Sequence, residues 1–306
     1  MALPVSSLAQ TQPKPFRWQL AYRPPFDWAG MLRFLGARML RGVEWVRDAE
    51  YLRTVRLGSY TGWIRIRHAP NQRALAIELS RSLAPTLPAI LRRLSHLFDL
   101  RARPNVIAGQ LMRGMLAEPV ARNPGLRVPG AFDGFELALH AILGPQMTVK
   151  AATILAGRFA ETFGDPIETA HPGLARLSPT PERIADARRE ELTALGIVEE
   201  RAESLVALAR EIAVGRITLD PGACPERTME QLVALPGIGR WTAEYIAMRA
   251  LGWPDAFPHG DVALRNSLGG VTTNRAEELS QAWRPWRSYA TLHLWQDWAW
   301  NRNRRA

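Results

Sequence analysis

The sequence of 306 residues contains a single cysteine, Cys224. One thiol excludes a disulfide within the chain, a four-cysteine iron–sulfur cluster and a cysteine-based zinc site. The sequence also lacks an apolar run of about 18 residues, and no charged segment followed by an apolar one opens it, so neither a transmembrane helix nor a secretory signal is expected. We therefore expect a soluble, cytoplasmic protein that has no membrane partner.

Lysine is almost absent as well. Of the 39 cationic residues only Lys14 and Lys150 are lysines, and the formal net charge is +10. A basic balance of this size favours polyanionic partners, nucleic acid first and anionic membrane second. The planar guanidinium of arginine suits phosphate, although on charge alone a role in solubility stays open.

Residue patterning divides the chain into a tail and two domains. Residues 1–14 are rich in Ser, Gln and Pro and lack periodicity, which predicts a flexible tail. Residues 15–103 mix short alternating segments with two helical patterns, which predicts an α+β domain. Its expected strands are 16–22, 43–46, 51–57, 60–68 and 73–80, and its expected helices run from Asp27 to about Arg41 and from Leu87 to about Leu100.

From Pro104 onward the strand signal disappears, so residues 104–306 are predicted to form an all-α domain. Gly, Pro and polar clusters separate its helical patterns. These patterns occupy 104–117, 132–143, 147–163, 181–194, 199–214, 227–234, 240–252, 262–268, 274–283 and 286–300.

A glycine turn between two helical patterns is the most specific local feature. In Leu-Pro-Gly-Ile-Gly, the backbone N–H groups of Gly237 and Gly239 lie before the next helix and can hold a phosphate. A monovalent cation bound by the backbone of Val233, Leu235 and Gly237 would complete such a seat. An ordinary helix–turn–helix corner is the alternative. The predicted hairpin residues are Leu235, Gly237, Ile238, Gly239, Arg240 and Thr242.

The helix after this turn carries an aromatic face and is followed by a carboxylate. Trp241, Tyr245 and Met248 have i, i+4 and i+7 spacing, which places them on one face. Asp261 stands just before the next helix, in an N-cap position. Each feature alone is typical of core packing or capping. Beside a phosphate-binding turn, they indicate a site that holds DNA next to a carboxylate.

The turn, helix and carboxylate resemble the helix–hairpin–helix and Gly/Pro-Asp motif of DNA base excision glycosylases. Five blocks spread over residues 16–300 resemble the bacterial DNA-3-methyladenine glycosylase II family, which is AlkA-like. They read YRPPFDWAGMLRFLGAR, LSHLFDL, FELALHAILGPQMTVKAA, LPGIGRWTAEYIAMR and WRPWRSYATLHLW. The fold that this resemblance implies is an N-terminal α+β domain of TATA-binding-protein-like topology followed by an all-α helix–hairpin–helix glycosylase core.

The resemblance also implies roles for individual residues. It makes Asp261, and not Asp255, the catalytic carboxylate that stabilises oxocarbenium-like charge on the deoxyribose. The wedge that fills the gap left by an extruded base aligns with Gln146, with Met147 as the alternative. His259 is expected to be a loop or phosphate contact. The implied base-pocket residues are Trp241, Tyr245, Trp295 and Phe34.

The implied activity is that of a monofunctional DNA glycosylase. Related bifunctional lyases carry a Schiff-base lysine where Trp241 stands, and neither lysine of this chain matches that place. The expected partner of a monomeric enzyme without a redox cofactor is duplex DNA with alkylated bases, mainly 3-methyladenine and also 7-methylguanine. Arg265 and Arg287 can contact the DNA backbone or remain solvated charges. A glycosylase for deaminated or oxidised purines and a catalytically silent DNA-binding module are the alternatives.

Overall fold

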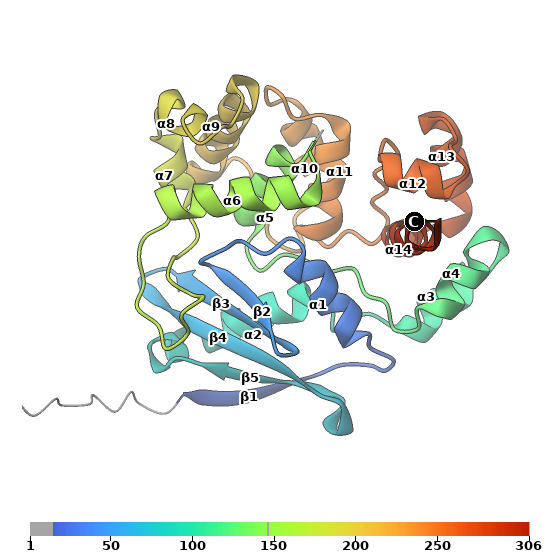
Figure 1. Ribbon diagram of the computed structural model, residues 1–306, viewed down its shortest axis with the longest axis horizontal. Helices are drawn as coiled ribbons and strands as arrows, with labels where there is room; N and C mark the ends of the chain where they lie inside the picture. The colour runs from blue at the N-terminus through green and yellow to red at the C-terminus, as the bar shows by residue number, and fades with distance from the viewer. Residues whose placement is uncertain (1–14, 146, 306) are drawn as a thin grey trace, which may run out of the picture.

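The computed structural model describes residues 15–145 and 147–305, and the predicted tail 1–14 lies outside this range. An antiparallel five-stranded sheet forms the N-terminal part, with strand order β1-β5-β4-β3-β2 (Figure 1). Each predicted strand is present, with small differences at its ends. The strands are β1 (Phe16–Ala21), β2 (Glu44–Arg47), β3 (Glu50–Leu57), β4 (Tyr60–Ala69) and β5 (Ala74–Leu79).

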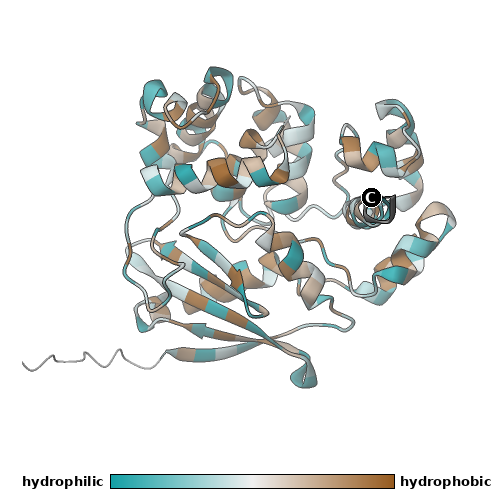
Figure 2. Cartoon of the chain, viewed as in Figure 1, coloured by the Kyte–Doolittle hydropathy of each residue, from teal (hydrophilic) through white to brown (hydrophobic). Residues whose placement is uncertain are grey.

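Alternation along the strands builds the first hydrophobic core. Ile64 and Ile66 of β4 pair with Leu79 and Ile77 of β5, and all four side chains are buried. Brown and teal bands alternate along the strands in Figure 2. Helices α1 (Trp28–Gly36) and α2 (Leu87–Leu97) contribute to the same core. Helix α1 ends before the predicted Arg41, because the chain turns there into β2.

The C-terminal part is helical, as predicted. Its helices are α3 (Pro104–Leu111), α4 (Ala117–Arg122), α5 (Gly134–Leu143), α6 (Val149–Phe163), α7 (Pro181–Ala185), α8 (Arg189–Thr193), α9 (Glu199–Ala213), α10 (Pro225–Val233), α11 (Arg240–Arg249), α12 (Val262–Ser267), α13 (Thr273–Ser280) and α14 (Arg287–Arg305). The prediction of one helix over 181–194 is wrong: the backbone N–H of Arg188 bonds the carboxylate of Glu191, which begins a second helix. Helix α4 was not predicted.

At the junction, residues of each part pack in the hydrophobic core of the other. Leu40 and Val43, which precede β2, pack in the helical core, and Phe132 packs in the core under the sheet. Arg53 of β3 forms an ion pair with Glu136 of α5 at 2.8 Å, and both side chains are almost fully buried. The site described below lies at this junction.

The loop between α6 and α7 runs down over the sheet and returns to the helical part (Figure 1). The imidazole of His171 meets the ring of Trp63 edge-on, with centroids 4.4 Å apart. Gly173 lies against the ring of Trp45, where a Cβ atom would come within 2.6 Å of it. A bridge joins Leu174 to Gly42. Among the described helices, none has the length and apolar character needed to cross a membrane.

Candidate active site

A pocket of about 900 Å³ lies where the hairpin, α5 and the end of α14 come together. It joins residues that are far apart in the sequence, from Leu35 at the end of α1 to Arg302 in α14. Some of the predicted residues of the hairpin, the wedge turn, the aromatic set and the catalytic position line it. They are Met147, Gly237, Gly239, Trp241, Thr242, Tyr245, Asp261 and Trp295.

Asp261 is held in place by three donors. As predicted, it is the N-cap of α12, and its Oδ1 accepts from the backbone N–H of Leu264 at 2.8 Å. The same oxygen accepts from Nε1 of Trp295 at 2.9 Å, and Oδ2 accepts from Nε1 of Trp241 at 3.3 Å. These bonds fix the orientation of a half-buried carboxylate at the pocket wall.

Three of the four predicted pocket aromatics stand together beside this carboxylate. The rings of Trp241 and Tyr245 stack with centroids 5.4 Å apart and an interplanar angle of 14°. Trp295 of α14 is tilted against Tyr245 at 6.3 Å. Met248, on the same predicted helix face, is instead buried in the core beyond the pocket lining.

Cations hold the inner end of this aromatic wall. Nη1 of Arg249 donates to Oη of Tyr245 at 2.8 Å, and the same guanidinium donates to the carbonyls of Pro129 and Gly130. Burial by itself would raise the pKa of the Tyr245 phenol, but the charges of Arg249 and Arg38 outweigh it and lower that pKa. The tyrosine ring is therefore fixed at both its face and its hydroxyl.

Phe34 stands behind the wall. It lies outside the residues that line the 900 Å³ pocket, and its ring is covered by guanidiniums of Arg38 at 3.9 Å and Arg249 at 4.8 Å. Both arginines do line the pocket. Sequence reasoning missed Arg38, although it follows Phe34 by four residues and so comes from the same side of the chain just after α1. The N-terminal domain thus presents Arg38 to the pocket, supported by Phe34.

The hairpin between α10 and α11 is present as predicted. Gly237 has φ +70°, and a Cβ atom there would lie 2.2 Å from Oγ of Ser204. Ile238 is buried and anchors the turn in the core, and Thr242 is also buried. Gly239 is the N-cap of α11 and makes no side-chain capping bond, and the space where a Cβ atom would stand on it is open. Phosphate binding by this turn stays a prediction.

The predicted monovalent cation at the backbone of Val233, Leu235 and Gly237 also stays a prediction. The carbonyl of Leu235 accepts from the backbone N–H of Ile238 at 3.3 Å, which leaves one of its two lone pairs. Elsewhere in the described chain, no group of three or more His, Cys, Asp or Glu side chains is placed to hold a metal ion.

The predicted wedge turn follows α5. Gln146 lies outside the described residues, and Met147 is 36% exposed. Arg201 of α9 holds the turn: its Nη1 donates to the carbonyl of Leu143 at 3.0 Å and contacts Sδ of Met147 at 3.1 Å. Its Nη2 donates to the carbonyl of Pro145. Sequence reasoning missed this arginine, because no local pattern links positions more than 50 residues apart.

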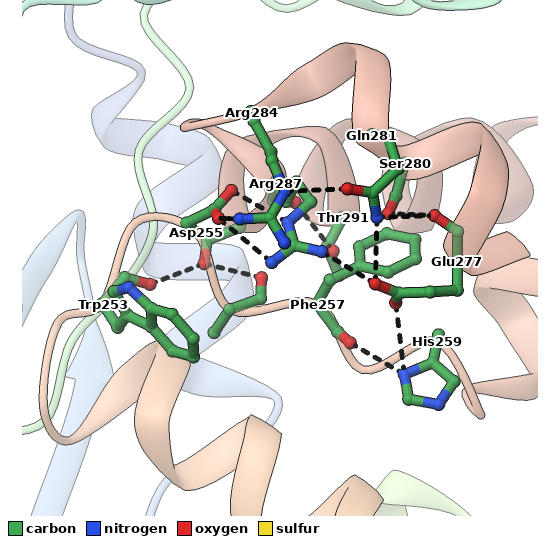
Figure 3. Close-up of polar contacts among 12 residues, drawn as sticks. Trp253, Asp255, Phe257, His259, Glu277, Ser280, Gln281, Arg284, Arg287 and Thr291 are labelled. Atoms are coloured by element: carbon green, nitrogen blue, oxygen red, sulfur yellow. Dashed lines mark hydrogen bonds and ion pairs between the residues drawn. The ribbon is translucent and has the colours of Figure 1, made fainter. Parts of the chain in front are cut away.

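A buried ionic cluster supports the loop that leads to Asp261 (Figure 3). Asp255 accepts from Arg287 at 2.8 and 3.0 Å and from Arg284 at 2.6 Å. Arg287 is only 5% exposed, and its guanidinium forms ion pairs with Asp255 and Glu277. The expectation that it contacts DNA or solvent is therefore wrong. Asp255 is a structural residue of this cluster.

His259 belongs to the same loop, and its contacts are with structural carboxylates rather than with the pocket. Its Nδ1 lies 3.2 Å from the carboxylate of Glu244 and 3.6 Å from that of Glu277. The bond to Glu244 raises the pKa of the imidazole against the opposing effect of burial. This arrangement is the loop contact that the sequence predicted.

Comparisons with known proteins agree with this geometry. Residues 17–133 match the AlkA N-terminal domain, and residues 139–287 match the HhH-GPD superfamily base excision DNA repair protein family. DNA-3-methyladenine glycosylase 2 of Escherichia coli is 37% identical over 283 residues, which cover 92% of this chain and 98% of the relative.

Two solved structures share the fold. A 3-methyladenine DNA-glycosylase from Archaeoglobus fulgidus has a TM-score of 0.81 at 22% identity, and the match covers 93% of this chain and 99% of the Archaeoglobus chain. MBOgg1, solved with a low-affinity DNA ligand, has a TM-score of 0.76 at 17% identity, and the match covers 93% of this chain and 96% of the MBOgg1 chain. At such identities the structures show the fold, while the sequence match shows the family. The chain therefore belongs to the DNA-3-methyladenine glycosylase II family of the HhH-GPD superfamily and is a DNA glycosylase of base excision repair.

Proposed function

We propose that this glycosylase removes alkylated bases, 3-methyladenine foremost and 7-methylguanine with it, and leaves an abasic site. One observation carries the proposal: the carboxylate of Asp261 is bonded to two of the three aromatic side chains that form the wall of an open pocket. The pocket thus offers ring faces to a base and a carboxylate to the sugar.

The chemistry of alkylated purines fits such a pocket. Alkylation at N3 or N7 makes the base cationic, and a cation over an aromatic face gains about 0.5–2 kcal/mol. A cationic base is also a good leaving group, so the enzyme mainly has to stabilise positive charge that develops on the sugar. A fixed carboxylate supplies that stabilisation without reorganisation. Asp261 is the group we assign to this role.

The proposed absence of lyase activity is supported by the residue beside Asp261. A lyase needs an amine nucleophile within reach of the sugar. The indole of Trp241 occupies this place and donates to the carboxylate. Lys150, on α6, is exposed and lies outside the pocket lining. We therefore assign hydrolysis of the N-glycosidic bond without strand cleavage.

The hairpin and the basic balance account for the handling of DNA. No side chain caps the start of α11, and the space beside the Cα of Gly239 is open, so a backbone phosphate can approach the first N–H groups of the helix. The net charge of +10 favours the duplex at low salt. We propose that a monomer in the cytoplasm, close to the nucleoid, binds duplex DNA in this way and inserts Gln146 or Met147 where the base was.

The decisive experiment compares wild type with Asp261→Asn on duplex DNA treated with dimethyl sulfate. Asn keeps an oxygen that can accept from the backbone N–H of Leu264 and the indole of Trp295, but it removes the charge and the acceptor for Trp241. We expect release of methylated bases to fall by roughly 10²–10³-fold, in line with the loss of one preorganised electrostatic group. Binding to a duplex with an abasic analogue should be retained. Product DNA should remain unbroken until it is heated in alkali.

Three outcomes would contradict the proposal. Equal release by both proteins excludes Asp261 as the catalytic group. Strand breaks made by the wild type without alkali contradict the absence of lyase activity. Release of hypoxanthine or 8-oxoguanine from single-lesion duplexes, with no release of methylated bases, replaces alkylated bases with deaminated or oxidised purines as the substrates.

A further inference from the structure

His140 lines the pocket and carries a buried ring nitrogen without a partner. It lies in the last turn of α5 and lines the same 900 Å³ pocket as Asp261 and Trp241. Its Nε2 is shielded from solvent, yet no described residue donates to it or accepts from it. Buried polar atoms are nearly always hydrogen-bonded, so an orphan beside a ligand pocket requires an explanation.

The polar neighbours of His140 are already engaged. Glu136, one turn earlier on α5, is paired with Arg53. Arg249 donates to Tyr245 and to two carbonyls, and Arg38 covers Phe34 and donates to its carbonyl. The imidazole nitrogen is left as a hydrogen-bonding group of the pocket without a bond inside the described protein.

The imidazole is also neutral. Burial lowers the pKa of His140 to about 4, and the nearby charges of Arg249 and Arg38 act in the same direction against the effect of Glu136. A neutral ring does not repel a cationic base, unlike the two guanidiniums around it. Depending on its tautomer, Nε2 can donate to a ring nitrogen or carbonyl or accept from an exocyclic amine.

We propose that Nε2 of His140 hydrogen-bonds the polar edge of the extruded base and makes His140 a specificity-determining residue. This inference rests on the proposed function, because it requires a base in this pocket. In the proposed binding mode the DNA backbone lies at the hairpin, so the group that enters the pocket beside His140 is the base. Nε2 is closed to solvent in the structure, so the imidazole has to turn toward the pocket to make this bond when a base is present.

The test uses two substitutions with opposite expectations. His140→Phe keeps a ring and removes the nitrogen, whereas His140→Gln keeps an amide that can donate or accept near the position of Nε2. On methylated duplex DNA at subsaturating concentration, we expect His140→Phe to release bases roughly 10-fold or more slowly than wild type. His140→Gln should stay within about 3-fold of wild type, because it can replace the bond.

A duplex with a tetrahydrofuran abasic analogue separates base reading from a structural role. This ligand has no base, so both variants should bind it as the wild type does. Loss of this binding in a folded His140→Phe overturns the proposal, because it shows damage to the site as a whole. If the Phe variant does not fold, His140→Leu carries the same expectations.

The outcomes also separate this inference from the proposed function. A wild type that releases no methylated base contradicts the proposed function. A wild type that does release it, together with a His140→Phe variant of equal rate, contradicts only the role of His140. In that case the orphan nitrogen bonds a resident water, and the base is held by ring faces alone.

Discussion

Asp261 combines two tasks in one side chain. Its Oδ1 caps α12 and accepts from Trp295, while its Oδ2 accepts from Trp241. The cap keeps the carboxylate still, and the indoles join it to the pocket wall. Any change of the carboxylate therefore acts on the start of a helix and on the site together, which is why Asn, which still caps, is the informative substitution.

The two indole donors should contribute unequally. Trp295→Phe and Trp241→Phe each keep a ring and remove one N–H. Because the Trp295 bond is the shorter, at 2.9 Å against 3.3 Å, we expect its loss to slow base release more. A hydrogen bond to a charged group is worth about 1.5–3 kcal/mol, so the larger effect should reach roughly 10–100-fold. Initial rates on methylated DNA check this, and a larger effect at Trp241 would contradict it.

Asp99 should make stability depend on pH. Burial raises the pKa of this half-buried carboxyl to about 6, although Tyr289 donates to it at 2.7 Å and Arg127 is near. Between pH 3.8 and about 6 the folded protein keeps a proton that the unfolded chain has released, so stability falls as pH rises through this window. Asp99→Asn removes that cost, and Asn tolerates the φ of +50° found there.

We therefore expect Asp99→Asn to be more stable than wild type by about 1–3 kcal/mol at pH 8. The difference should vanish toward pH 4, where the wild-type carboxyl is protonated in the folded state. Urea unfolding at pH 4, 6 and 8 measures this. A difference that stays constant across the three pH values would falsify the titration account.

At the scale of elements, local sequence patterns predicted the strands, caps and turns that depend on residues close together in the sequence. The strand predicted over 73–80, observed as β5 (Ala74–Leu79), depends on Leu75, Ile77 and Leu79, whose period of two is a property of the strand itself. The cap at Asp261 and the glycine turn were predicted from residue types at neighbouring positions. The split of 181–194 was missed, since the capping bond from Arg188 to Glu191 lies inside a continuous helical pattern.

Contacts between distant positions could not be predicted in this way. Arg201 donates to the wedge turn, and Arg287 forms an ion pair with Asp255. The sequence around an arginine does not show whether its side chain is buried in an ion pair or exposed to solvent. The resemblance supplied the site residues that were found together, and it had no place for Arg38 or His140. Side-chain pairing in three dimensions decided those cases.

Substitutions at the two glycines of the hairpin should have different effects, one on stability and the other on DNA binding. At Gly237 a Cβ atom is strained by the positive φ and meets Ser204, so Gly237→Ala should lose roughly 1–3 kcal/mol of stability. At Gly239 a Cβ atom meets nothing within 4 Å, so Gly239→Ala should melt like wild type. Its methyl group would stand where a phosphate approaches, and we expect weaker binding to duplex DNA.

Thermal melting and fluorescence anisotropy with an abasic-analogue duplex distinguish these effects. Equal melting of the two variants contradicts the strain at Gly237. Binding by Gly239→Ala that equals wild type contradicts the placement of a phosphate at the uncapped start of α11.

At the scale of the whole molecule, the two domains share their cores. Phe132 from the helical half of the sequence packs under the sheet, and Val43 from the other half packs among helices. Arg53 and Glu136 are 83 residues apart and form a buried pair at this junction, with Arg53 also over the ring of Phe132 at 4.2 Å. Glu136 lines the pocket, so the junction and the site are one structure.

Breaking this pair on one side should be costly. Arg53→Met leaves the buried carboxylate of Glu136 unpaired, and we expect a loss of about 3–5 kcal/mol of stability. The double variant Arg53→Met with Glu136→Leu should recover at least half of this loss, because the carboxylate of Glu136 is then gone, while Glu44, 3.7 Å from Arg53, still accepts from Tyr51 and the backbone N–H of Leu40. Urea unfolding of both variants and of Glu136→Leu measures the coupling. A double variant as unstable as the sum of the single ones contradicts it.

The loop over the sheet has a consequence for synthesis on the ribosome. The strands are complete at Leu79, but His171 and Gly173, which contact the rings of Trp63 and Trp45, come more than 90 residues later in the chain. At about 5–20 residues per second, the newly made sheet waits roughly 5–20 s without these contacts. During that interval the nascent chain displays more of both indoles than the finished enzyme does, which half-buries them.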